Sequence, residues 1–104
     1  MATKKTSTKA AAERPVIICT DKRGVFFGYV AGDTKGKDPI DLLRARMCVF
    51  WSTATKGVLG LASTGPADGS RVGAAVPKIE LRGITCVIEC EPAAVERWER
   101  GPWA

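Results

Sequence analysis

Two short apolar runs, separated by a polar turn, lie at residues 16–20 and 25–30. Residues 16–20 are a β-branched run, which predicts a buried strand. A polar turn over residues 21–24 separates this run from residues 25–30, which we expect to pair with it as a hairpin. Gly28 lies in the middle of the second strand and indicates a bulge, a sharp bend or the close approach of another backbone.

The longest nearly unbroken apolar run is LLRARMCVFW at residues 42–51, and two arginines interrupt it. We expect a long third strand over residues 40–51, which either bends or begins with a helical turn near residues 39–42. Alternation with a period of two predicts that one face of this strand is buried. The face expected in the core carries Leu43, Ala45, Met47, Val49 and Trp51. The opposite face carries Leu42, Arg44, Arg46, Cys48 and Phe50.

Segments rich in turn residues lie on both sides of the third strand. Residues 31–39 are dense in such residues and predict a loop with an exposed tip. Residues 52–65 are ambiguous, because apolar residues recur at helical spacing while glycines weaken a helix. We favour a short helix in the 55–63 region, followed by a loop over residues 66–73.

The last third of the chain predicts two strands and a helix. Residues 76–81 alternate, and residues 84–90 show the clearest alternation in the protein. Pro92 suits the first position of a helix over residues 92–100. The residues of the last strand that we expect to face inward are Ile84, Cys86, Ile88 and Cys90.

The order of elements predicts a mainly β fold of the α+β class. Five short strands, a glycine within the second strand and a C-terminal helix favour a small, bent, five-stranded barrel of the SH3-like or Sm-like type. An open antiparallel sheet with the helix across one face is the competing architecture.

The length of 104 residues indicates one domain. We expect residues 1–14 to be a disordered basic tail and residues 15–104 to be a single small β-barrel-like domain. No apolar run is long enough for a membrane span, and the N-terminus lacks the apolar core of a signal peptide. We therefore expect a cytosolic protein with reduced thiols and no membrane partner.

The net charge of +5 is unevenly distributed, because residues 1–14 carry +3 of it. The basic residues of this tail are Lys4, Lys5, Lys9 and Arg14. Such a tail can attract nucleic acid or another anionic surface, and it can equally serve as a solvated tail that keeps the protein soluble.

The residues that most enzymes require do not form a recognisable set. The chain contains no histidine, its carboxylates form no evident pair, and no phosphate-binding glycine motif is present. We expect the four cysteines to be buried free thiols, since they lie in apolar runs without the close spacing of a metal site. We therefore expect no enzyme, no metal and no cofactor. These cysteines are Cys19, Cys48, Cys86 and Cys90.

The third strand carries the best candidates for a binding site. Arg44 and Arg46 would project from one face about 6.5–7 Å apart, a spacing that suits the oxygens of a phosphorylated ligand. Aromatic residues beside them can stack a base, and basic residues in the next loops can close over the ligand. The alternative is that both arginines pair with Glu80 or Glu89, or lie at a subunit interface. The candidate ligand-binding residues are Arg44, Arg46, Phe50, Trp51, Lys56 and Arg71.

A series of short motifs follows in order along the chain: Val16-Ile17-Ile18-Cys19-Thr20, Gly24-Val25-Phe26-Phe27-Gly28, Leu43, Ala45-Arg46-Met47, Phe50-Trp51, Leu61-Ala62, Gly65, Val76-Pro77-Lys78-Ile79-Glu80-Leu81, Ile88-Glu89-Cys90-Glu91-Pro92 and Pro102-Trp103. These motifs, which cover roughly residues 15–103, resemble those of a widespread family of small, uncharacterised phage and prophage proteins. Met47 stands where that family has a second arginine. The resemblance implies a phage origin and brings no established activity.

Three functions follow as hypotheses. The first is a phage-encoded, oligomeric binding protein that captures a phosphorylated or nucleotide ligand, for instance one that signals in host defence. The second is a small nucleic-acid-binding barrel that uses the basic tail. The third is a structural or assembly protein of the virion. We expect a homo-oligomer in each case, located in the host cytoplasm or in the virion, because a barrel this small has exposed strand edges.

Overall fold

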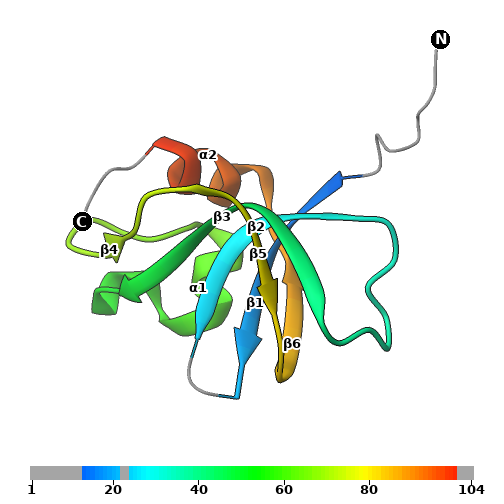
Figure 1. Cartoon of the computed structure of the whole chain (residues 1–104). Helices are drawn as coiled ribbons and strands as arrows, with labels where there is room; N and C mark the ends of the chain where they lie inside the picture. The colour runs from blue at the N-terminus through cyan, green and yellow to red at the C-terminus, as the bar shows by residue number, and fades with distance from the viewer. Residues whose placement is uncertain (1–12, 22–23, 101–104) are drawn as a thin grey trace, which may run out of the picture.

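The computed structural model describes residues 13–21 and 24–100, and they form one antiparallel sheet with two α-helices (Figure 1). The tail residues Lys4, Lys5 and Lys9, together with Trp103, lie outside the described residues. The strands are β1 (Glu13–Thr20), β2 (Val25–Ala31), β3 (Ile40–Phe50), β4 (Arg71–Val72), β5 (Val76–Leu81) and β6 (Ile84–Glu89). The helices are the 3₁₀ turn η2 (Thr53–Thr55), α1 (Gly57–Ser63) and α2 (Pro92–Arg100).

The sheet is open and has six strands, so the expectation of a closed five-stranded barrel is wrong. The strand order is β4-β3-β2-β1-β6, and β5 pairs with the first half of β3. β5 and β6 lie at opposite edges of the sheet, and no pairing joins them within the described residues. The competing open-sheet architecture is therefore the one observed, and the mainly β, α+β class is confirmed.

Sequence patterns predicted most elements to within a few residues. β5 and α2 have the expected bounds, and a helix forms at residues 57–63 within the region expected for it. β3 begins as a strand rather than as a helical turn. β4 was expected to be loop, and β1 begins at Glu13, so Arg14 belongs to the sheet and not to the tail.

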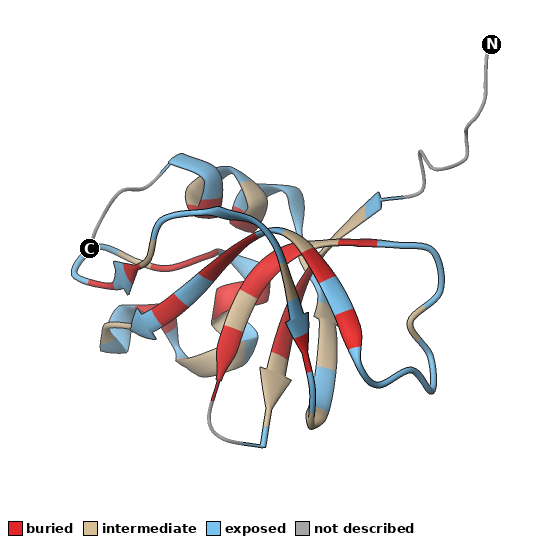
Figure 2. Cartoon of the chain, in the orientation of Figure 1, coloured by how far each residue is buried: buried red, intermediate tan, exposed pale blue. Residues whose placement is uncertain are grey.

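β1 is buried on both faces, since Val16, Ile17 and Ile18 have no exposed surface (Figure 2). Each face of the sheet therefore supports its own apolar cluster. In one cluster, side chains of α1 and α2 pack on the same face of the sheet against Ile17, Phe27 and Cys48. The other cluster is built by the strands alone, around Val16, Ile18, Val30, Ile40, Leu42, Ala45 and Leu81.

Trp98 attaches α2 to the sheet. Its ring is completely buried and stacks on Phe27, with ring centroids 5.0 Å apart and an angle of 5° between the planes. The indole Nε1–H donates to the carbonyl oxygen of Leu61 at 3.0 Å, so α2 is bonded to α1 as well. A buried indole needs such an acceptor, because an unpaired N–H in the core would be costly.

A β-bulge in β3 changes which residues of that strand are buried. In the β2–β3 pair, Phe27 lies opposite Arg46 and Tyr29 lies opposite Leu43. Gly28 is the single residue of β2 between these pairs, and it lies opposite two residues of β3, Arg44 and Ala45. Arg44 is the inserted residue, and its backbone has a positive φ of 49°. Of the three alternatives that Gly28 left open, two are observed: a bulge in the pairing, and the close approach of another backbone, since a Cβ there would lie 2.8 Å from the carbonyl oxygen of Leu43.

The predicted faces of β3 are wrong on both sides of this bulge. Before it, Leu42 is completely buried although it was expected opposite the core face, and Leu43 is only half-buried. Ala45 is buried as expected, but Met47 and Val49 are 45% and 63% exposed. Cys48 and Arg46 are buried instead. The inserted residue shifts the alternation by one position, which moves every later side chain to the other face.

Candidate functional site

Arg44 and Arg46 do not project together from one face of β3. Arg44 is exposed at the bulge, where its Nη2 lies 2.7 Å from Oε1 of Glu13. Its guanidinium also lies 4.2 Å from the centroid of the Tyr29 ring. The carboxylate and the ring hold this arginine at the sheet surface, and its acidic partner is neither Glu80 nor Glu89.

Arg46 is only 8% exposed and serves as an internal connector. Its Nε–H donates to the carbonyl oxygen of Gly73 at 2.7 Å, and its Nη1–H donates to that of Trp98 at 2.5 Å. Burial lowers the pKa of this guanidinium, because leaving water disfavours the charged form. The side chain therefore bonds β3 to the segment before β5 and to the end of α2.

A cavity of about 170 Å³ lies between the two arginines and the end of α2. Glu99 also lines it, and the Tyr29 hydroxyl donates a hydrogen bond to this carboxylate. Burial, together with Glu99, raises the pKa of Tyr29. A carboxylate already accompanies the two cations here, so an anionic ligand would meet a competing negative charge.

The other four predicted ligand-binding residues are only partly brought together. Phe50 lies directly opposite Arg71 in the β3–β4 pair, and both are exposed. Trp51 is half-buried and packs against the helix-covered cluster. Lys56 lies between η2 and α1 in a left-handed conformation.

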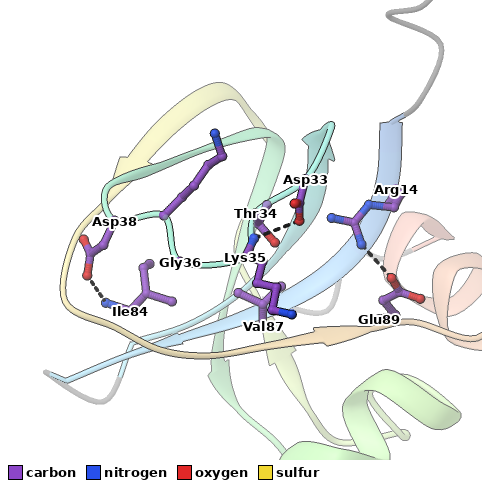
Figure 3. A pocket seen from close by; sticks show the side chains of 10 residues that line it. Arg14, Asp33, Thr34, Lys35, Gly36, Asp38, Ile84, Val87 and Glu89 are labelled. Atoms are coloured by element: carbon purple, nitrogen blue, oxygen red, sulfur yellow. Dashed lines mark hydrogen bonds and ion pairs between the residues drawn. The ribbon is translucent and has the colours of Figure 1, made fainter.

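A larger recess lies where the loop after β2 meets β6, and we call it the loop recess (Figure 3). Its volume is about 500 Å³, which is within the usual range of small-ligand sites. Three basic and three acidic side chains line it. The charged residues are Arg14, Lys35, Lys37, Asp33, Asp38 and Glu89.

Two carboxylates of the loop recess, Asp38 and Asp33, accept hydrogen bonds from backbone N–H groups. Asp38 accepts hydrogen bonds from the backbone N–H groups of Gly83 and Ile84, at 3.2 and 3.0 Å. Asp33 accepts one from the backbone N–H of Lys35 at 3.0 Å. Figure 3 shows the Asp38–Ile84 bond, which fastens the loop to the start of β6.

Arg14 and Glu89 form an ion pair at one side of the loop recess. Nη1 of Arg14 lies 2.6 Å from Oε2 of Glu89, and Nη2 donates to the carbonyl oxygen of Gly32 at 3.0 Å. The ammonium groups of Lys35 and Lys37 form no ion pair with any residue that the structure describes. Asp33 and Asp38 form no ion pair with a described residue either, so the formal charges of the recess balance.

The loop recess was not predicted from the sequence, although the loop itself was. The available signal was Lys35-Gly36-Lys37 at the tip of a turn-rich segment. Gly36 has a φ of +73°, and a Cβ there would meet no atom within 4 Å. A second recess of about 410 Å³ shares Lys37 and continues to Lys78 on β5, so the loop separates two hollows.

The four cysteines are free thiols in different surroundings. Cys48 is buried and Cys90 is half-buried, and burial raises their pKa values to about 11 and about 12. A reactive thiolate at Cys48 is therefore disfavoured at neutral pH. Cys86 is exposed, contrary to the expectation that all four are buried.

Within the described ranges, no cluster of three or more cysteine, aspartate or glutamate residues is suited to hold a metal ion. None of the helices described has the length and apolar character needed to cross a membrane.

The fold and its surface features define a class of protein, a single α+β domain with two helices on one face of an open sheet. The chain belongs to the DUF6948 family, a domain of unknown function whose model matches residues 13–98. No curated protein and no solved structure matches the chain.

Proposed function

We propose that this domain is a non-catalytic binding protein that captures a small phosphorylated ligand in the loop recess. The observation that carries the proposal is that Lys35 and Lys37, whose ammonium groups form no ion pair within the described part of the chain, lie beside Arg14 in a recess of about 500 Å³. Ammonium groups bind phosphate oxygens as compact charges with several donors.

The neighbouring carboxylates do not prevent such binding in this proposal. Asp38 and Asp33 accept backbone hydrogen bonds, and Glu89 pairs with Arg14. Their negative charge is thus partly compensated locally. A ligand with two or more phosphate groups supplies enough charge to engage both lysines.

The biological setting of this proposal rests on the resemblance to phage and prophage proteins. A phage-encoded domain that sequesters a host signalling nucleotide needs to bind it tightly and needs no catalytic residue. Such a domain would act in the host cytoplasm. The loop recess then replaces the predicted Arg44–Arg46 site as the place of capture.

Calorimetric titration tests the proposal with pyrophosphate and a panel of linear and cyclic nucleotides. We expect saturable binding of at least one ligand that weakens as salt increases. Changing both Lys35→Gln and Lys37→Gln should weaken it by about tenfold or more, because each charge-assisted contact contributes about 1.5–3 kcal/mol. Lys56→Gln is the matched control, since Lys56 is an exposed lysine outside the recess.

Two results would overturn the proposal. One is the absence of saturable binding across the panel. The other is equal affinity of the double variant and the wild-type protein.

Nucleic-acid binding is the second candidate, and the exposed Phe50–Arg71 pair favours it. An aromatic ring can stack a base while the adjacent guanidinium contacts a phosphate. The tail residues Lys4, Lys5 and Lys9 would add charge. Anisotropy of a labelled single strand distinguishes this candidate, because Phe50→Leu should weaken oligonucleotide binding without changing nucleotide binding in the loop recess.

We also propose that the domain forms a homo-oligomer through apolar side chains at the end of β3. Met47, Val49 and Phe50 are each at least 45% exposed on this short stretch, and we call them the β3 patch. Exposed apolar side chains that occur this close together on one strand favour association. Assembly within a virion is a third candidate, and it requires the protein to be present in purified particles.

A further inference from the structure

Cys19 and Cys86 lie directly opposite each other in the β1–β6 pair. Cys90 and Pro15 lie opposite each other in the same register, four residues along each strand from Cys86 and Cys19, and the backbone N–H of Cys90 donates to the carbonyl oxygen of Pro15 at 3.1 Å. Hydrogen-bonded pairs recur at every second residue of an antiparallel ladder, so the two cysteines occupy a hydrogen-bonded position. Their side chains therefore emerge side by side on one face of the sheet.

The two thiols interact in the reduced protein. Burial and a hydrogen bond with the Cys86 thiol raise the pKa of Cys19 to about 12. Cys86 is exposed on the edge strand β6, whereas Cys19 is half-buried. An oxidant thus reaches Cys86 first, with Cys19 immediately behind it.

The backbone geometry permits a bond between them. Hydrogen-bonded partners in an antiparallel pair have Cα atoms about 5.5 Å apart, which lies within the range spanned by disulfides. Their Cβ atoms are farther apart than a relaxed disulfide prefers, so closure requires a local twist. The ladder already has a register shift between Cys19 and Thr20, where such a twist can be accommodated.

We propose that Cys19 and Cys86 are a redox-active dithiol that closes to a reversible cross-strand disulfide on reaction with a small-molecule disulfide. The Cys86 thiolate attacks one sulfur of the oxidant and releases the first small thiol, which leaves a mixed disulfide on Cys86. Cys19 Sγ then attacks Cys86 Sγ as its proton passes to the departing sulfur, and the second small thiol is released. The protein loses two protons and two electrons, and the oxidant is reduced to two thiols.

The disulfide joins the edge strand β6 to the central strand β1. β6 carries Ile84, Val87 and Glu89, which line the loop recess, so the bond fixes one wall of that recess. The twist needed for closure makes the bond easier to reduce than an unstrained disulfide. This dithiol stands independently of any ligand in the recess.

Native full-length protein treated with oxidised glutathione, then alkylated and analysed by mass spectrometry, tests the proposal. We expect loss of two alkylatable thiols per chain, a cross-linked peptide pair that contains Cys19 and Cys86, and recovery of both thiols with dithiothreitol. Cys90→Ala is the control and should retain the cross-link, because its thiol has Pro15 rather than a cysteine opposite. Stable glutathionylation of Cys86 beside a free Cys19 would overturn the proposal, as would a disulfide between the Cys86 residues of two chains.

A trivalent arsenical provides an independent readout, because it forms a ring with two neighbouring thiols. Phenylarsine oxide should bind one per chain to the wild-type protein and should not bind to the Cys86→Ser variant. Cys86 is exposed, so this variant should fold, and circular dichroism checks that it does. Equal binding by wild type and variant would contradict the dithiol.

Discussion

Arg44 and Arg46 show how the surroundings decide the role of a side chain. Both stand on β3, two positions apart. Arg44 remains at the surface with Glu13 and Tyr29, whereas Arg46 is buried with two backbone carbonyl groups as acceptors. Hydrogen bonds from a buried charged group contribute more than a solvated ion pair, so Arg46 should matter for stability and Arg44 far less.

Replacing Arg46 should therefore destabilise the protein strongly. Arg46→Met keeps much of the volume and removes the donors to Gly73 and Trp98, leaving two carbonyl groups without their partner. We expect the free energy of unfolding to fall by about 2–4 kcal/mol. Arg44→Met is the matched control and should cost about 1 kcal/mol or less. Urea unfolding, monitored by tryptophan fluorescence, measures the free energy of unfolding of both variants. Equal decreases in the two variants would contradict the role of Arg46 as a connector.

At the scale of elements, the bulge that joins β2 and β3 governs the arrangement of the sheet. Gly28 lies opposite the extra residue, and a Cβ at this position would lie 2.5 Å from Cγ of Leu42 and 2.8 Å from the carbonyl oxygen of Leu43. The two backbones approach each other closely only because this side chain is absent. The bulge then places Arg46 towards α2 and Met47 towards solvent.

Gly28→Ala should disturb this contact. A methyl group would press on backbone atoms that cannot rotate away, so we expect a loss of about 1–3 kcal/mol in the free energy of unfolding. Gly73→Ala is the control, because a Cβ there would have its nearest neighbour at 3.7 Å, an ordinary contact. Thermal unfolding compares the two variants. If Gly28→Ala were as stable as the wild-type protein, the β2–β3 bulge would have to relax easily around the added methyl group, contrary to this expectation.

For the whole molecule, the open sheet leaves edges and apolar side chains accessible. β5 and β6 lie at opposite edges, and the β3 patch lies near the short strand β4. Open edges and exposed apolar groups both favour association between copies. These features support a homo-oligomer without specifying the number of subunits.

Light scattering coupled to size exclusion tests this association. We expect a mass above the 11.1 kDa of one chain at micromolar concentrations. Val49→Lys in the β3 patch should shift the protein towards the monomer, because a charge would be buried at the interface. Leu59→Lys is the control, since Leu59 is 71% exposed on α1 and lies outside the patch. A monomer at all concentrations, or equal masses for both variants, would contradict the proposed interface.

The sequence by itself determined the elements and the class of fold. Alternation, β-branched runs and turn residues are local signals, and they predicted five of the six strands, the C-terminal helix and the bulge at Gly28. The two-residue strand β4 was missed, because so short a pairing depends on its neighbour Cys48 rather than on its own pattern.

Tertiary structure decided what the strands do with their side chains. One inserted residue at Arg44 reversed the faces of β3, and simple periodicity cannot detect such an insertion. Only the packed sheet showed that β5 and β6 do not pair with each other within the described residues and that Arg46 bonds to the carbonyl oxygen of Trp98. The loop recess likewise forms between segments distant in sequence, Arg14, the 32–39 loop and β6, so its residues are related by folding and not by spacing along the chain.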